Sequence, residues 1–311
     1  MPFPLLPHAF FDLGDGGKLR YARFEPASAP CGTILIVPGR REFIEKKYAE
    51  LGDRLRGRGY RLIIVEPRGQ GLSSRFLSGA QRQRDHIGDF KMHLDDLRAF
   101  FAAVVLPDLA APLIFHGHSM GAHLILRWLA EDRPAQAKAA FLTAPMLALS
   151  SLPAHALAHG VSWLSVHVLG HATEYAPMQH DFDARDCTFE DNVLTQDPER
   201  FPIIENYFKA HPDLTVGGVT WGWLLASMYS MHIAHRHGYL ANIDIPVLAL
   251  VGDRDKVTPV KETGPYLNEI PRVRTHIIAN ARHDLMNEAD AARNEVWTQV
   301  EEFLSSVLTA R

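Results

Sequence analysis

The serine at position 119 is the residue of this chain best suited to do chemistry. It stands in the sequence Gly-His-Ser-Met-Gly (residues 117–121), which matches the pattern G-x-S-x-G. A strand-like apolar run precedes it at 112–116, and a stretch with helical spacing follows at 122–130. Such a strand–turn–helix element holds the serine in a strained conformation with its hydroxyl exposed, and glycines flank it because the two elements pass too close for a side chain. We therefore predict that Ser119 is a nucleophile.

A serine hydroxyl needs a base within hydrogen-bond reach and a carboxylate that orients the base. With this pattern, the chain order is serine, then aspartate or glutamate, then histidine. Asp255 and His283 each follow a later strand-like run, so we predict them as the carboxylate and the base. Asp253 directly follows the turn glycine and suits a turn role. Asp284 adjoins His283 in sequence and is poorly placed to meet its imidazole.

Two backbone N–H groups are expected to stabilise the oxyanion that such a reaction forms. One belongs to Met120, which follows the nucleophile at the start of a helix. The other is expected in the loop after the first well-defined strand, where Gly39 permits a close backbone approach and Arg40 supplies the N–H.

Apolar runs of strand length alternate with helical stretches along much of the chain. This alternation predicts an α/β protein with a mostly parallel central sheet flanked by helices on both faces. Functional loops of such a sheet gather at the carboxyl ends of its strands, which is where Ser119, Asp255 and His283 stand. The expected strands are 33–37, 61–65, 112–116, 139–143, 246–251 and 274–278, and the expected helices lie near 48–58, 90–105, 122–130, 261–269 and 291–308.

The alternation is interrupted between about residues 145 and 243. This stretch is rich in His, Trp, Met and Tyr and has helical pieces, such as 221–232, but no clear strand. A structureless loop of that length is implausible in a compact domain. We predict a helical cap over the strand ends, with a core at 1–145, the cap at 146–240 and the rest of the core at 241–311.

Composition excludes several classes of protein. The net charge is −4 over 311 residues without a long basic run, so no nucleic-acid partner is expected. No signal peptide is expected, and histidines interrupt the apolar stretch at 152–169, which we reject as a transmembrane segment. Cys31 and Cys187 fit a reducing cytoplasm. We expect a cytoplasmic protein; transient contact with a membrane surface and the oligomeric state stay open.

No metal or cofactor is expected. His232, His235 and His237 do not share one helical face, and no acidic residue joins them. The glycines at 69 and 71 could mimic a phosphate loop, but the Lys-Ser/Thr pair that such a loop requires does not follow them.

The motifs together resemble the α/β-hydrolase superfamily. Residues 117–121, the sequence Gly-Asp-Arg-Asp at 252–255 and His283 carry the general resemblance. The finer resemblance is to the bacterial lysophospholipase and monoacylglycerol-lipase branch. Residues 38–50 are similar to its pattern P-G-R-x-E…K-Y-x-E, and residues 66–73 to D-x-R-G-x-G-x-S, with Glu66 for the usual Asp. Residues 192–195, 217–223 and 282–288 are similar to N-x-L-T, G-G-x-T-x-x-W and R-H-E-L-x-N-E, the last with Asp284 for the usual Glu.

This resemblance implies an α/β-hydrolase fold with a helical cap inserted after the sixth strand. It also implies hydrolysis of a lysophospholipid or a monoacylglycerol through an acyl-enzyme. A short-chain carboxylesterase or thioesterase and a non-catalytic receptor for a small ligand are the alternatives. The candidate substrate contacts are Gly39, Arg41, His118, Trp163 and Trp223. Alternative roles stay open: apolar cap residues such as Trp163 could serve packing, and His118 could be structural. Arg40 and Arg41 could be solvated at the surface.

Overall fold

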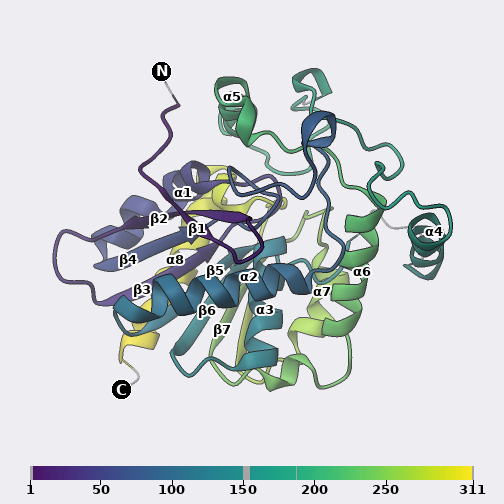
Figure 1. Ribbon diagram of the computed structural model, residues 1–311. Helices are drawn as coiled ribbons and strands as arrows, with labels where there is room; N and C mark the ends of the chain where they lie inside the picture. The colour runs from purple at the N-terminus through teal and green to yellow at the C-terminus, as the bar shows by residue number, and fades with distance from the viewer. Residues whose placement is uncertain (1–2, 150–154, 187, 310–311) are drawn as a thin grey trace.

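A central sheet of eight strands organises the computed structural model, which describes residues 3–149, 155–186 and 188–309 (Figure 1). The strand order is β1-β2-β4-β3-β5-β6-β7-β8. From β4 to β8 along this order every neighbouring pair is parallel, whereas β1 and β2 pair antiparallel at one edge. The strands are β1 Ala9–Asp12, β2 Lys18–Phe24, β3 Gly32–Val37, β4 Tyr60–Val65, β5 Leu113–His118, β6 Ala137–Thr143, β7 Val247–Gly252 and β8 Val273–Ile278.

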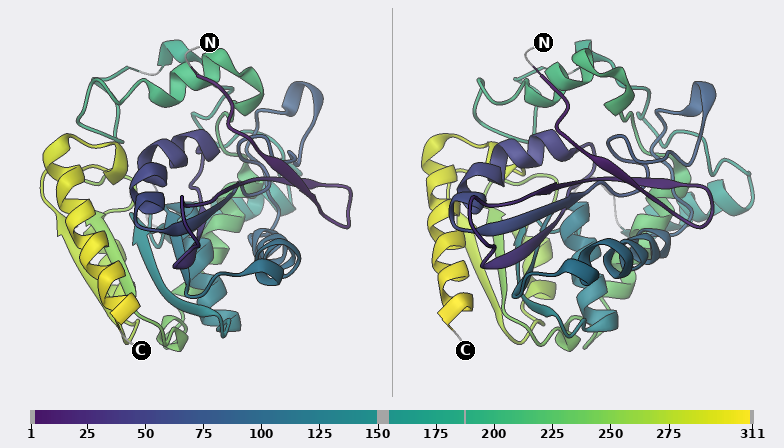
Figure 2. Two further views of the ribbon diagram at one scale, coloured as in Figure 1. Left: turned by 90° about the vertical axis from the view of Figure 1, so that its left-hand side faces the viewer. Right: turned by 60° about the vertical axis from the view of Figure 1, so that its left-hand side comes forward.

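Helices cover both faces of the sheet, as Figure 2 shows. Side chains alternate along β3: Ile34 and Ile36 pack with α1 and α8, whereas Leu35 and Val37 pack with α2 and α3. This period of two is the reason that one strand serves two hydrophobic cores. The fold class predicted from the sequence is therefore confirmed. The helices of the core are α1 Ile44–Gly57, α2 Lys91–Phe100, α3 Met120–Asp132, α7 Val260–Leu267 and α8 Asp290–Thr309.

The antiparallel edge is the part of the sheet that the sequence analysis missed. β2 reads Lys-Leu-Arg-Tyr-Ala-Arg-Phe, so three charged residues interrupt its apolar residues. One of them, Arg20, is buried in ion pairs with Glu45 and Glu66, whereas β3 and β7 are nearly continuous apolar runs. A search for apolar runs alone therefore passes over β2.

The described part of the segment between β6 and β7 contains three α-helices: α4 His155–His167, α5 Ile203–Ala210 and α6 Trp221–Ala234. Its described residues form only isolated bridges, one between Tyr175 and Thr220 within the segment and one from Val219 to Asp85. The helix α6 is rich in apolar residues, and its residues Trp223, Met228 and Met231 join the main hydrophobic core, whereas Tyr229 is exposed. The division into a core at 1–145 and 241–311 and a cap at 146–240 stays a prediction.

Two further observations concern membrane-spanning helices and the cysteines. Of the helices in the described ranges, none is long and apolar enough to cross a membrane. Cys31 is an exposed free thiol, and Cys187 lies outside the described residues.

Candidate active site

The backbone turn at Ser119 sets the position of its hydroxyl. Ser119 links β5 to α3 with φ 51° and ψ −115°, a conformation that non-glycine residues rarely adopt. Its N–H donates to the carbonyl of Thr143 (2.9 Å), and its own carbonyl accepts from Met146 N (3.1 Å). A Cβ at Gly121 would lie 2.0 Å from the carbonyl oxygen of Val37, so only glycine lets α3 approach β3 this closely. The turn is thus fixed by both its hydrogen bonds and its packing.

A continuous chain of hydrogen bonds joins the three residues predicted to form the triad. His283 Nε2 lies 3.0 Å from Ser119 Oγ, and His283 Nδ1 lies 2.8 Å from Asp255 Oδ2. All three side chains are buried, and Ser119 is 9% exposed. When the Nδ1–H donates to the carboxylate, Nε2 is left as an acceptor for the serine hydroxyl. This geometry suits proton removal from Ser119 during nucleophilic attack.

Asp255 is held by the loop that carries it. Its Oδ1 accepts from the backbone N–H groups of Val257 (2.7 Å) and Thr258 (2.9 Å), and its Oδ2 accepts from Thr258 Oγ1 (2.8 Å). Burial alone would raise the pKa of Asp255. The hydrogen bond to His283, the charge of His283 and the hydrogen bonds from Thr258 together lower this pKa to about 2. The sequence analysis missed Thr258, although an Asp with a Thr three residues later is a pattern of side-chain-to-backbone turns.

The two rejected aspartates have other partners. Asp253 Oδ1 accepts from Ala281 N (3.1 Å) and so joins the loop after β7 to the loop after β8. Asp284 Oδ2 forms an ion pair with Lys46 Nζ at 2.8 Å. Asp255 is therefore the aspartate that the structure places against the His283 imidazole.

The loop after β3 presents an N–H group that is available for an oxyanion. Gly39 N donates to Glu42 Oε2 (2.6 Å) and Arg41 N donates to Gln70 Oε1 (2.7 Å). Among the hydrogen bonds of the described residues, none uses the N–H of Arg40 between them.

The N–H of Met120 is likewise available for an oxyanion. Met120 is the first residue of α3, so its N–H has no acceptor within the helix. A helix N-terminus also carries partial positive charge, which suits an anionic oxygen. The N–H groups of Arg40 and Met120 stay the candidate oxyanion donors.

The guanidinium groups near this loop have protein partners. Arg40 Nε donates to Asp85 Oδ2 (2.8 Å), and the Arg41 guanidinium lies 5.2 Å from the ring centroid of Phe182 and 5.6 Å from that of Phe208. Both side chains therefore contact protein groups and are not simply surrounded by solvent. Contact of Arg41 with a substrate stays a prediction.

The other candidate substrate contacts occupy different environments. His118 is buried, its Nδ1 lies 3.0 Å from Thr143 Oγ1, and burial lowers its pKa to about 3, so it is neutral. Trp223 is buried and packs edge-on against Phe90. Trp163, on α4, is 45% exposed. Of the two tryptophans, Trp163 is the one that a ligand or a surface can reach, and a substrate role for any of them stays a prediction.

Among the described residues, one group has the spacing of metal ligands. Atoms of Glu42, His118 and Asp284 lie within 4.8 Å of one another. The ammonium of Lys46, however, lies 2.8 Å from an oxygen of Glu42 and 2.8 Å from an oxygen of Asp284. A lysine thus occupies the place where a cation would bind, and the site does not favour a metal ion.

Comparison with known proteins places the chain in a family. Residues 28–290 match the family model described as "Serine aminopeptidase, S33". The chain therefore belongs to this family, and it is a serine hydrolase.

The individual relatives are only distantly similar to the chain in sequence. Lysophospholipase L2 of Escherichia coli K12 is 27% identical over 306 residues, which cover 94% of this chain and 85% of the relative. A probable lysophospholipase L2 of Haemophilus influenzae is 25% identical over 289 residues, with 93% and 88% covered. The structure of a soluble variant of monoglyceride lipase from Saccharomyces cerevisiae, at 18% identity, matches with a TM-score of 0.72 over 96% of each chain and shows the shared fold.

The triad geometry predicts the effect of three substitutions on ester hydrolysis. His283→Ala removes the base and Asp255→Asn removes the charge that orients it, so each should lower kcat on the order of 10³-fold or more. Asp253→Asn is the matched control, with a much smaller expected loss, because Asp253 binds a backbone N–H and not the imidazole. Steady-state hydrolysis of a p-nitrophenyl ester measures all three. Equal losses in the two aspartate variants would show that the carboxylate is misassigned.

The lowered pKa of Asp255 predicts a pH-dependent part of the folding stability. Lowering from 3.8 to about 2 corresponds to a stabilisation on the order of 2 kcal/mol. Because the folded-state pKa is depressed, this stabilisation is present above about pH 4 and is lost as the pH falls through about 2. Urea unfolding of wild type and Asp255→Asn should give a larger difference in unfolding free energy at about pH 5 than at about pH 3. A difference that does not change with pH would contradict the prediction.

Proposed function

We propose that this serine hydrolase cleaves the carboxylic ester of a lipid with one acyl chain, a lysophospholipid or a monoacylglycerol. The observation that carries the proposal is the buried hydrogen-bond chain from Ser119 through His283 to Asp255. Two relatives aligned over most of the chain are named lysophospholipases, which supports the substrate class.

The reaction follows from the positions of these groups. Ser119 Oγ attacks the ester carbon while its proton passes to His283 Nε2, and the carbonyl oxygen becomes an oxyanion that the N–H groups of Arg40 and Met120 can receive. The bond to the leaving oxygen then breaks, and His283 returns the proton to the alcohol. Water, deprotonated by the same imidazole, attacks the acyl-enzyme and releases the fatty acid with the free serine.

A cavity beside α6 offers one candidate space for an acyl chain. The cavity measures about 780 Å³ and lies between α6 and α7. Its lining combines apolar residues such as Met228 and Met231 with polar ones such as His232 and Lys261. Burial of each methylene group contributes about 0.8 kcal/mol, so such a space favours longer chains until it is full.

The substrate proposal predicts how the rate depends on chain length. The kcat/KM for p-nitrophenyl esters should rise several-fold with each added pair of carbons from acetate upward, because burial of two methylene groups contributes up to about 1.6 kcal/mol. Lysophosphatidylcholine and a monoacylglycerol, assayed beside the esters, should be cleaved as efficiently as the best of them. Highest activity on acetate or butyrate esters would instead support a short-chain carboxylesterase.

We also propose that α4 contacts the surface of the lipid aggregate from which the substrate comes. Its sequence contains no Asp, Glu, Lys or Arg. Exposed apolar side chains on one segment of this kind are typical of surfaces that meet a membrane or a partner. The exposed apolar residues on and directly after this helix are Leu157, Val161, Trp163, Leu164, Val168 and Leu169.

Polar substitutions on α4 should separate lipid binding from catalysis. The variant Leu157→Ser/Leu164→Ser/Val168→Ser should sediment less with phosphatidylcholine vesicles and should cleave vesicle-embedded substrate several-fold more slowly. Its rate on monomeric p-nitrophenyl butyrate should stay near that of wild type. Phe10→Ser on β1, where Phe10 is 45% exposed, is the control for loss of an exposed apolar group elsewhere. Unchanged sedimentation of the α4 variant would contradict this role.

A further inference from the structure

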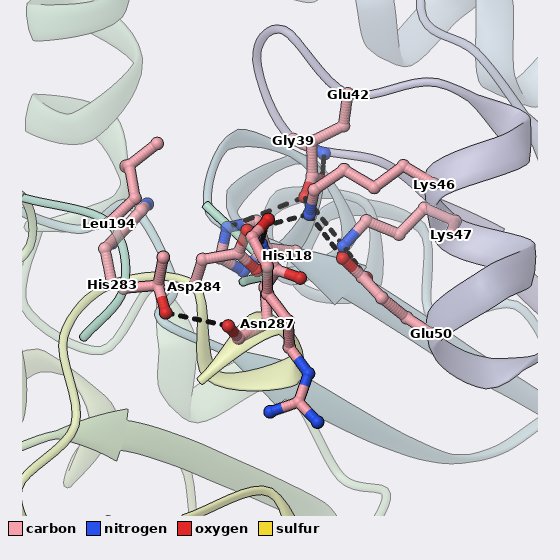
Figure 3. Close-up of polar contacts among 12 residues, drawn as sticks. Gly39, Glu42, Lys46, Lys47, Glu50, His118, Leu194, His283, Asp284 and Asn287 are labelled. Carbon is pink, nitrogen blue, oxygen red and sulfur yellow. Dashed lines mark hydrogen bonds and ion pairs between the residues drawn. The ribbon is translucent and has the colours of Figure 1, made fainter. Parts of the chain in front are cut away.

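A cluster of five buried charged side chains lies beside the proposed oxyanion loop (Figure 3). We call it the buried charge cluster. Charges at this depth persist only when they are paired, because removal from water is costly. Three carboxylates here face two ammonium groups, and each side chain is at most 6% exposed. The members are Glu42, Lys46, Lys47, Glu50 and Asp284.

The two lysines of the cluster differ in one contact. Lys47 Nζ lies 2.7 Å from Glu42 Oε1 and 2.7 Å from Glu50 Oε2. Lys46 Nζ contacts the same two glutamates and, in addition, lies 2.8 Å from Asp284 Oδ2. Lys46 and both glutamates come from α1 and the loop before it, whereas Asp284 belongs to the loop after β8. Of the two lysines, Lys46 alone connects these segments.

One end of this connection reaches the oxyanion loop. Glu42 holds Lys46 through Oε1 and accepts the N–H of Gly39 through Oε2 at 2.6 Å. Gly39 directly precedes Arg40, whose N–H is a candidate oxyanion donor. The position of the Glu42 carboxylate therefore sets the orientation of the peptide before that donor.

The other end reaches the proposed catalytic base. Asp284 follows His283 in the chain, and its backbone is fixed by two hydrogen bonds of 2.8 Å, from its N–H to Leu194 O and from Asn287 N–H to its carbonyl. Lys46 fixes its side chain. Because Asp284 and His283 share a peptide bond, a shift of Asp284 would move the backbone from which the His283 ring reaches Ser119 Oγ.

We propose that Lys46 is a positioning residue for the ester hydrolysis proposed above, on which this inference rests. Its ammonium holds the oxyanion loop and the His283 loop at a fixed separation. An ammonium suits this task because it donates three hydrogen bonds from one point, here to three carboxylates. Burial would lower the pKa of Lys46, but the charges of Asp284, Glu42 and Glu50 raise it well above its usual value, so the bridge stays charged.

The adjacent lysine provides a matched control. Lys46→Met and Lys47→Met each remove one buried ammonium from the same two glutamates, so both should lower the melting temperature. Only Lys46→Met removes the ion pair between α1 and Asp284, in the loop that carries His283. Its kcat on p-nitrophenyl butyrate, per active site titrated with a fluorophosphonate, should fall on the order of 10²-fold with KM changed less than about threefold. Lys47→Met should keep at least about a tenth of the wild-type kcat.

A double variant separates positioning from stability. Lys46→Met/Asp284→Asn removes the carboxylate that the single variant leaves unpaired, so its melting temperature should recover while kcat stays low. Equal kcat losses in the two lysine variants, or recovery of kcat together with stability, would overturn the proposal. If wild type cleaves no ester, the proposed function fails. The rate of Ser119 phosphonylation in these proteins then still tests whether Lys46 positions the site, because that rate requires no ester substrate.

Discussion

The left-handed backbone at Ser119 is the constraint on which the whole site depends. It is tolerated because α3 packs against β3 through Gly121, where no side chain fits. The same close approach brings the N-terminus of α3 against Val37 and Pro38, the residues that lead into the loop with Arg40. The nucleophile and the candidate oxyanion donors are thus consequences of one packing contact.

The parallel sheet supplies the remaining groups. Loops at the carboxyl ends of β3, β5, β7 and β8 carry Arg40, Ser119, Asp255 and His283, and the fixed spacing of adjacent strands brings these loops together. Strands place a loop only approximately, however. Hydrogen bonds of Thr258 to Asp255 refine one loop, and the Lys46 ion pairs connect two others.

The six strands from β3 to β8, the mostly parallel character of the sheet and the three residues joined by hydrogen bonds could be predicted from the sequence, because apolar runs and chain order are local signals. The antiparallel edge strand β2 was missed because charged residues interrupt its apolar ones. The contact between Lys46 and Asp284 joins residues 238 positions apart, and no local pattern indicates it. Burial of Trp223, Met228 and Met231 of α6 in the main core could not be predicted from the sequence, because the apolar residues of this helix do not mark one face.

A crystal structure of the enzyme after reaction with an alkyl fluorophosphonate would test the proposed chemistry most directly, because the adduct resembles the tetrahedral intermediate. We expect phosphorus bonded to Ser119 Oγ, with one phosphonyl oxygen about 3 Å from the backbone nitrogens of Met120 and Arg40. His283 should keep its hydrogen bond to Asp255. An adduct on another residue, or a phosphonyl oxygen directed away from both nitrogens, would contradict the assignment of nucleophile and oxyanion donors.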